Sequence, residues 1–464
     1  MSKRKRVLML KEKHYTSTGR PSFFALTPFF VFIGMYIFLI SFFSNASNQH
    51  KLTAFPIFSV FAAIVYSLFT FQERISISKK IKIFISGVSR STVIYMCFIF
   101  IFSAIFSHFT LLSGGVDSAI KFCYVLIPDG WILPGIFTAI ALFSLTIGSA
   151  IGGIATFAPI AAGMAPKLGV DPALMAGIAV SGAMLGDNLS VISDTTIAVI
   201  HTTGSSPFKK FKSNAMLVLP AFIVTIIILS MMSSHLNPTL GSEVIATWDM
   251  SDVFKIIPYG AVFFLAMSGV DVLAVLAIGA LLAAFFGISY GHFSIFSAIT
   301  YFFEGFYQQR GMIAIFLLVM FIAGLSRIVE HNGGIKFLLY KFRARTKTKA
   351  GAELSIALLV SLIEIAIARN TISILIAGPM ARQIGGKFKI KSARIATLLD
   401  LFACTVHGML PYSSQLLLAA AIAGTTSFAV IPHLYYLYIV FVVAVLSIVK
   451  TTIVERIQNR ATKS

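Results

Sequence analysis

Long apolar segments separated by short polar ones run along the whole chain. Many of them hold about 20 residues, the length that an α-helix needs to cross a hydrocarbon layer of about 30 Å. The pattern predicts an all-α polytopic membrane protein with about ten spans. Two leading helices are expected in 23–71 and two linking helices in 256–288, with a basic segment at 1–22 and a tail at 451–464.

The apolar segments occur twice. Repeat 1 covers 91–232 and repeat 2 covers 311–450, with an offset of about 220 residues that pairs Ala158 with Gly378. The paired segments are 91–112 with 311–329, 131–165 with 353–385, 173–201 with 393–424, and 215–232 with 433–450. In the third pair the sequences align after a shift of one residue, so that Leu189 faces Leu410. The repetition predicts two similar halves.

Within each half, one segment must begin and end on the same side of the membrane if the other spans are to be oriented consistently. We therefore expect 131–165 and 353–385 to enter and leave by the same membrane face, as re-entrant hairpins. Their tips would fall at Gly148 to Gly153, which includes Ser149, and at Arg369 to Thr371. Irregular backbone at membrane depth is tolerated only where protein covers it or where it lines a watery cavity. Such tips indicate a central site.

Basic residues indicate which ends face the cytoplasm. The chain holds 37 Lys and Arg against 17 Asp and Glu, a net charge of +20. Most of the basic residues lie in six patches, at 3–20, 72–90, 202–214, 327–352, 382–394 and after 449. This asymmetry is typical of a bacterial-type inner-membrane protein with both termini in the cytoplasm. It also favours contact with anionic lipid headgroups, and it explains the positive net charge without a nucleic-acid partner.

The same charges orient the two halves. The turn at 167–172 is sparse in charge and is expected outside, while its partner, 382–394, is strongly basic and is expected inside. The repeats are therefore predicted to be inverted. Inverted repeats whose broken helices meet near the membrane midplane are typical of secondary transporters.

Composition and motifs argue against an enzyme. Hydrophobic residues make up 57% of the chain and charged residues 12%, and the mean hydropathy is +0.90. The three cysteines have no metal-binding or redox spacing, and the chain carries neither a nucleotide-binding loop nor a nucleophile motif. We therefore expect a membrane transporter without a cofactor. A homodimer is left open.

The most polar stretch inside an apolar segment runs from Gly186 to Thr196. If it crosses the membrane, Asp187 and Asp194 lie near the middle, where each charge costs from about 3 to more than 10 kcal/mol. Its hydroxyls and amide compete with the helical ladder, so an unwound segment is expected. Carboxylates, hydroxyls and an amide supply the hard oxygens that a sodium ion prefers. The candidate ion-binding and proton-binding residues are Asp187, Asn188, Ser190, Ser193, Asp194 and Thr195, with sodium assigned to the two acids.

The run from Gly186 to Thr196 resembles the signature of the NhaC-type sodium/proton antiporters of the ion transporter superfamily. The resemblance extends to Ser144–Pro159, to Asn332–Ile335, to Asn370–Pro379 and to Leu410–Gln415. It covers most of the chain and implies an ion-coupled antiporter that binds sodium or protons on the two broken segments. Some relatives exchange organic acids, so the resemblance implies the transport mechanism more directly than the transported solute.

The chain departs from the family pattern at two positions. Arg369 stands where a neutral polar residue is expected, and His407 stands where glutamine is expected. The sequence places Arg369 as the only basic residue deep in an apolar segment, and its guanidinium stays charged under ordinary conditions. The candidates in the second repeat are Arg369, Asn370, Thr371, Asp400, His407, Ser413, Ser414 and Gln415, with Ser149 and Glu364 on the hairpins.

Each candidate also has a structural interpretation. The motif acids could cap helices or form a buried ion pair, and Asn370 and Thr371 could cap a helix at the hairpin tip. Asp400 and Glu364 could be partners of Arg369 or of Arg394. His407 could carry a proton near neutral pH or be a satisfied interior histidine.

We interpret the sequence as an antiporter that exchanges sodium or lithium for protons by alternating access. Burial favours a protonated carboxyl group and a bound cation favours the ionised one, so both ions compete for Asp187 and Asp194. The alternative is a sodium- or proton-coupled exchanger of an organic anion or amino acid on the same fold, with Arg369 as the anchor. An ion channel is less favoured, because no selectivity ring is visible.

Overall fold

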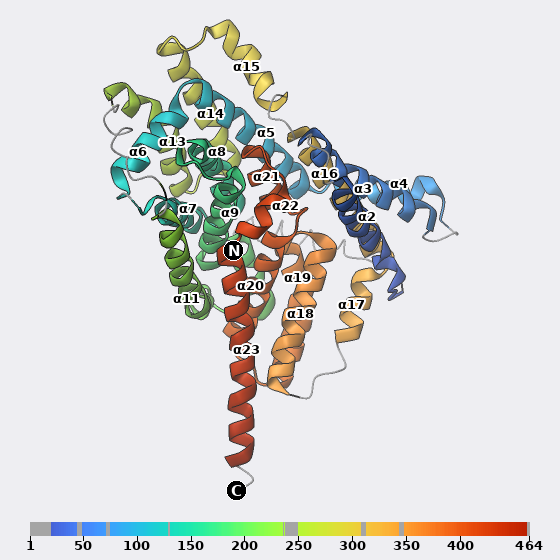
Figure 1. The fold of residues 1–464 in the computed structure, drawn as a ribbon. Helices are drawn as coiled ribbons and strands as arrows, with labels where there is room; N and C mark the ends of the chain where they lie inside the picture. Colours follow the sequence, from blue (N-terminus) through green and yellow to red (C-terminus); the bar gives the residue numbers. More distant parts are fainter. Residues whose placement is uncertain are drawn as a thin grey trace, which may run out of the picture.

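The computed structural model describes residues 20–43, 49–70, 75–128, 130–234, 236, 249–307, 312–342 and 348–461. Within these residues every regular element is a helix, as Figure 1 shows. Eight helices are long and apolar enough to cross a membrane, or up to ten if each of two bent pairs is one span. The predicted class, an all-α polytopic membrane protein, is confirmed. Most of the basic segment 1–22 lies outside the described residues.

The helices outside the repeats form two groups. The leading group is η2 (Phe24–Leu26), α2 (Thr27–Phe43), α3 (Gln49–Thr70) and α4 (Ile77–Val88), and the linking group is α13 (Met250–Met267), α14 (Val272–Ser289) and α15 (Ile295–Tyr307). The short basic helix α4 packs against α16 through Gly87 and Phe84. The apolar pattern did not predict this helix.

Two series of helices follow the same order. The first is α5 (Ser91–Leu112), α6 (Gly115–Leu126), α7 (Ile132–Ile147), α8 (Ala150–Leu168), α9 (Pro172–Leu189), α10 (Asp194–Thr203) and α11 (Pro207–Ser233). The second is α16 (Met312–His331), α17 (Gly334–Phe342), α18 (Lys349–Ile367), α19 (Asn370–Lys387), α20 (Ser392–Met409), α21 (Ser414–Ile422) and, after the short α22 (Ser427–Val430) and η3 (Ile431–His433), α23 (Tyr435–Ala461). The series are structural repeats.

The offset between the repeats is constant through the broken helices. The helices α9 and α20 end at Leu189 and Met409, and the N-caps of α10 and α21 are Ser193 and Ser413. Both pairs of positions differ by 220 residues. The predicted one-residue shift was therefore wrong, because the helix ends, and not the few identical side chains, mark equivalent positions.

The repeats run in opposite directions. Where α9 and α20 cross, Gly408 packs against Met184 and the Cys404 thiol points at Asp187. From Met184 to Asp187 the contacts move towards the C-terminus of α9, while from Gly408 to Cys404 they move towards the N-terminus of α20. The two helices are therefore antiparallel. The equivalent helices of the two halves are thus inverted, as the charge pattern predicted.

Both long segments fold as helical hairpins. Gly182 and Gly186 on α9 pack against the backbone of Phe137 and Ala141 on α7, so α7 runs parallel to α9. The following helix, α8, folds back, with Gly153 against Ser144. A Cβ atom at Gly186 would lie 2.2 Å from the Ala141 carbonyl oxygen, so only glycine permits this approach.

The hairpin tips meet the breaks of the broken helices. Gly148 ends α7 in the left-handed conformation, with φ of 71°, and lies against the backbone of Ser193. In the second half, Ala368 ends α18 with φ of 52°, and the Tyr412 hydroxyl donates a hydrogen bond to the Ile365 carbonyl at 2.7 Å. Each half thus brings two interrupted helices together.

The opposite orientation of the halves predicts a difference in accessibility. Lys167 and Lys387 are equivalent positions near the ends of α8 and α19. Single cysteines there, in a variant without Cys97, Cys123 and Cys404, should react with a membrane-impermeant thiol reagent from opposite sides of the membrane. Labelling of both positions from one side would contradict the inverted arrangement.

Candidate functional site

The break between α9 and α10 is stabilised by its own hydroxyl groups. Ser193 caps α10, and its Oγ accepts a hydrogen bond from the Thr196 amide at 3.2 Å. The Thr196 hydroxyl donates to the Ser190 carbonyl at 2.6 Å, and the Thr195 hydroxyl lies 3.0 Å from Ser193 Oγ. The predicted unwound segment is present, and these hydroxyls satisfy backbone groups that the interrupted helix leaves open.

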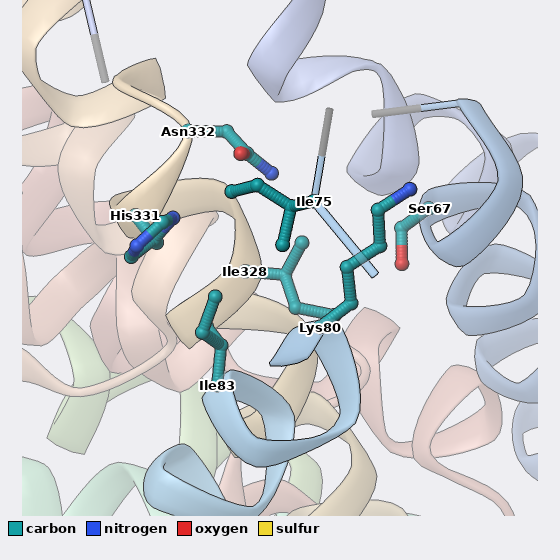
Figure 2. Close-up of a pocket in the computed structure, with 7 residues that line it drawn as sticks. All are labelled: Ser67, Ile75, Lys80, Ile83, Ile328, His331 and Asn332. Atoms are coloured by element: carbon teal, nitrogen blue, oxygen red, sulfur yellow. The ribbon is translucent and has the colours of Figure 1, made fainter. Parts of the chain in front are cut away.

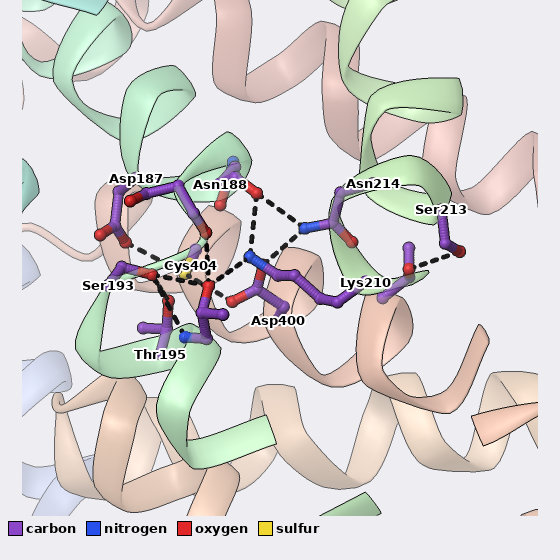
Figure 3. A network of polar contacts seen from close by, with 12 residues as sticks. Asp187, Asn188, Ser193, Thr195, Lys210, Ser213, Asn214, Asp400 and Cys404 are labelled. Carbon is purple, nitrogen blue, oxygen red and sulfur yellow. Dashed lines mark hydrogen bonds and ion pairs between the residues drawn. The ribbon is translucent and has the colours of Figure 1, made fainter. Parts of the chain in front are cut away.

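A fully buried ion pair lies beside this break. Lys210 Nζ and Asp400 Oδ2 are 2.7 Å apart, and both side chains have 0% exposure. The ammonium also donates to the Asn188 carbonyl at 3.0 Å and to Thr196 Oγ1 at 2.8 Å. Asn214 Nδ2 donates to Asp400 Oδ2 at 2.6 Å and to the same carbonyl at 2.8 Å. Figure 3 shows how Lys210 and Asn214, from α11, converge on α9 and α20.

Asp187 lies on the other side of Cys404. Its side chain is buried, and its Oδ2 is 3.8 Å from the Cys404 thiol. The same thiol lies 3.9 Å from Asp400 Oδ1 and accepts from Asn370 Nδ2 at 3.6 Å. In the described part of the chain no basic side chain forms an ion pair with Asp187. This carboxyl group therefore needs either a proton or a cation from outside the protein to be neutral.

Two amide oxygens also lack partners. The Asn188 side chain donates through Nδ2 to the Tyr436 hydroxyl at 2.9 Å. Its Oδ1, like that of Asn214, is buried and accepts no hydrogen bond from a described residue. Buried oxygens of this kind are costly unless a donor or cation reaches them. We call Asp187, Asn188, Thr196, Lys210, Asn214, Asp400 and Cys404 the central network.

The remaining second-repeat candidates divide into two groups. His407 lies between Glu364 and Gln415, and Ser414 also reaches Gln415. We call these four residues the histidine cluster. Ser413 caps α21, as Ser149 caps α8, and Asn370 Oδ1 accepts from the half-buried Thr371 amide.

Asp194 differs from the expectation that both motif acids are buried. It occupies the first turn of α10 with an exposed side chain, where the charge of Arg369 acts on it. The reason is the break itself, which turns α10 so that Thr195 and Thr196, and not Asp194, face the interior. The two acids of the motif therefore occupy different environments.

Asp400 and Glu364, which were expected as partners of Arg369 or Arg394, form close contacts with other side chains. Asp400 pairs with Lys210, and Glu364 contacts His407. Arg394 pairs with Glu353 at 2.8 Å. The expectation that Arg369 is the only basic residue deep in an apolar segment was wrong, because Lys210 is fully buried.

Four important residues were missed from the sequence, namely Lys210, Asn214, Cys404 and Tyr436. Lys210 and Asn214 lie four residues apart, on one face of α11, and this spacing was the available signal. The basic neighbours Lys209 and Lys212 concealed it, because all three lysines were assigned to a cytoplasmic patch.

Among the described residues, no group of three or more His, Cys, Asp or Glu side chains is arranged to hold a metal ion. Sodium binding at Asp187 and Asp194 stays a prediction. A small pocket elsewhere, between α3, α4 and α16, is shown in Figure 2. It lies at the bend between α16 and α17 and shares no residue with the central network. Its lining is Ser67, Ile75, Lys80, Ile83, Ile328, His331 and Asn332.

Comparison with known proteins agrees with this architecture. Residues 1–234 match the C4-dicarboxylate anaerobic carrier family, and residues 244–452 match the Na+/H+ antiporter family. The Na+/H+ antiporter NhaC of Alkalihalophilus pseudofirmus is 22% identical over 354 residues, which cover 71% of this chain and 76% of that protein. The chain belongs to the NhaC-type antiporter family. The resemblance inferred from the motifs is confirmed.

A further relative is named for a different cargo, and one solved structure is also similar. The malate-2H+/Na+-lactate antiporter of Bacillus subtilis is 20% identical over 330 residues, 66% of this chain and 70% of the relative. The YdaH transporter of Alcanivorax borkumensis has a solved structure that aligns with 91% of this chain and 98% of its own, with 14% identity and a TM-score of 0.39. That similarity is too low to assign a shared fold.

The buried ion pair predicts a large effect on stability. Lys210→Met leaves Asp400 buried and unpaired, which should destabilise the protein by about 3–5 kcal/mol. Adding Asp400→Asn removes the second charge and should recover most of the loss. The measurement is thermal unfolding in detergent, with Lys167→Met as the control, because that lysine forms an exposed pair with Asp117 and should cost about 1 kcal/mol or less. Equal losses in Lys210→Met and Lys167→Met would contradict this interpretation.

Proposed function

We propose that the protein exchanges sodium or lithium for protons across the bacterial inner membrane by alternating access. One observation carries the proposal: Asp187 is buried at the meeting of two interrupted helices, and no described basic side chain neutralises it. An uncompensated carboxylate is unstable there, so the group must bind a proton or a cation in turn. The NhaC-type relatives, whose names state Na+/H+ antiport, support this cargo.

The surrounding oxygens suit a monovalent cation. Asn188 Oδ1 and Asn214 Oδ1 are buried without donors, and carboxylate and amide oxygens are ligands that hard cations prefer. Lys210 and Asp400 neutralise each other, so they do not repel or compete for the ion as free charges would. We infer that Asp187 exchanges ions while the Lys210–Asp400 pair holds the helices around it.

The membrane orientation belongs to the same proposal. The basic patches favour both termini in the cytoplasm, and in that orientation α10 and α19 would end on the cytoplasmic side and α8 would end outside. Gly204, at the end of α10, lies beside Arg382 of α19, as two cytoplasmic ends should. Release of sodium on one side and of protons on the other then needs only one half to move relative to the other.

The central test replaces the exchanging acid. Asp187→Asn keeps the volume but removes the titratable charge, so sodium-driven proton movement in liposomes should fall to background while folded protein still accumulates. Internal pH is read after a sodium or lithium pulse. Asp117→Asn is the matched control, because that acid is exposed and pairs with Lys167, and it should exchange normally.

Two results would contradict the proposed ion exchange. Wild-type exchange in Asp187→Asn would show that Asp187 is not the coupling group. No pH response of the unaltered protein to any alkali cation would exclude sodium/proton exchange altogether.

A second candidate is exchange of an organic anion. It is favoured by the match of residues 1–234 to the C4-dicarboxylate carrier family and by Arg369 at the second hairpin tip. A guanidinium can hold a carboxylate with two parallel hydrogen bonds, which lysine reproduces poorly. In this version sodium or protons drive the movement of the solute.

Substitution at Arg369 separates the two candidates. If Arg369 only balances Asp194, Arg369→Asn should retain cation exchange with a changed pH profile. If it binds a solute carboxylate, Arg369→Lys should already raise the KM for that solute. Liposomes are tested with sodium, lithium, potassium and a panel of organic acids and amino acids. We expect the balancing role, and loss of solute exchange in normally expressed Arg369→Lys would prove that wrong.

A further inference from the structure

The histidine cluster lies in the second half, at the hairpin tip and the helix break. Glu364 on α18, His407 on α20 and Gln415 on α21 are almost fully buried. His407 Nδ1 is 2.7 Å from Glu364 Oε1, and His407 Nε2 contacts Gln415 Oε1. The Ser414 hydroxyl donates to the same Gln415 oxygen at 2.8 Å, and an amide oxygen accepts hydrogen bonds only.

This geometry sets the number of protons in the cluster. Both ring nitrogens of His407 face oxygen acceptors, but a neutral imidazole has only one N–H group. A second hydrogen must therefore lie on the His407–Glu364 contact. It belongs either to an imidazolium beside a carboxylate or to a carboxylic acid that donates to the ring. Both forms contain the same total number of protons and have no net charge.

Loss of that hydrogen would be costly in the closed structure. It would leave a buried carboxylate facing a bare ring nitrogen, and Glu364 Oε2 already has no hydrogen-bond partner among the described residues. The proton should therefore leave only when water reaches the cluster. A static core histidine has no need of two acceptors, because one acceptor and one donor satisfy a neutral imidazole.

The repeat relates His407 to the first site. The constant offset of 220 residues places His407 at the position of Asp187, one turn before the break of its helix. It also places Glu364 at the position of Ser144, on the equivalent hairpin. The two inverted halves thus present a protonatable group at the same place, with different chemistry.

The histidine cluster and the central network both include residues of α20, but their charged groups have different partners. Asp400, on the same helix, is neutralised by Lys210 from α11. The packed elements also carry Asp187 on α9, Asp194 on α10 and Arg369 at the start of α19, and Glu353 on α18 pairs with Arg394 of α20. The further charged groups and histidines with described side chains on these elements are His201, Lys209, Lys212, Lys349, Arg382, Lys387 and Lys450. Tyr412 adds a neutral hydroxyl. Glu364 is the acid in direct contact with the imidazole.

We propose that the Glu364–His407 pair is a second proton-binding site, which carries one proton in each transport cycle in addition to the ion exchanged at Asp187. The inference rests on the proposed function for its role in transport. When the second half opens, the N–H or O–H bond of the pair breaks and the proton passes to water; when the pair is protonated again, the half can close.

The first test measures the number of protons exchanged per sodium ion. In liposomes, opposing sodium and pH gradients are set until net flux stops, which gives the ratio. Glu364→Gln with His407→Gln keeps hydrogen-bonding side chains but cannot hold the proton, so the ratio should fall by one proton per sodium. The matched control is His108→Gln with Glu304→Gln, a peripheral histidine–glutamate pair 4.0 Å apart, which should leave the ratio unchanged. An unchanged ratio in the first variant would overturn the proposal.

The second test reads the proton directly and does not depend on transport. In protein labelled with ¹³C-histidine, the resonance that disappears in His407→Gln is assigned to His407 and followed between about pH 5 and pH 9, with and without sodium. We expect the resonance to change with pH or with sodium, as proton binding and release at this pair require. A resonance constant at every pH, with and without sodium, would overturn the proposal even if sodium/proton exchange is intact. Failure of exchange with a titrating His407 would instead reject the proposed function alone.

Discussion

The buried pair of Lys210 and Asp400 holds the two inverted halves together. Two charges without exposure are stable because the ammonium uses all three of its N–H groups, for a carboxylate, a carbonyl and a hydroxyl, and the carboxylate also accepts from Asn214. The carbonyl that the ammonium and Asn214 share belongs to Asn188, the penultimate residue of α9. The position of the first break is therefore tied to α11 of its own half and to α20 of the other.

An interruption of a helix inside a membrane leaves backbone groups without hydrogen-bond partners. In this chain, the side chains of small hydroxyl residues satisfy some of them. Ser193, Ser413 and Ser149 each cap the helix that follows an interruption. The hydroxyls of the motif therefore serve first as helix caps and as partners of open backbone groups. In the proposed exchange, Asp187 and the two asparagine oxygens without a described partner are the groups that would hold the cation.

Hydropathy, helix-breaking residues and the placement of the basic residues were enough to predict the helical class, the hairpins, the broken segments and the inversion, because these depend on local pattern and on the membrane. The pairing of Lys210 with Asp400 was not predictable in this way. Both residues are far apart in the chain, and the burial of the lysine arises only when α11 packs against α20. The exposure of Asp194 was missed for the same reason, since the direction of α10 after the break is set by its contacts with α19 and α20.

Inverted repeats with identical side chains would make the inward-open and outward-open states mirror one another, with no preference between them. Here the equivalent positions differ: the first half has a lone carboxyl group at Asp187, and the second has the neutral pair of Glu364 and His407. A cation can replace the proton on a lone carboxyl group at little cost, whereas it has no comparable place in a pair already neutral through its own proton. The two halves should thus respond to different ions. Such a difference is what directed exchange requires, because a ligand shifts a conformational equilibrium only by its differential affinity for the two states.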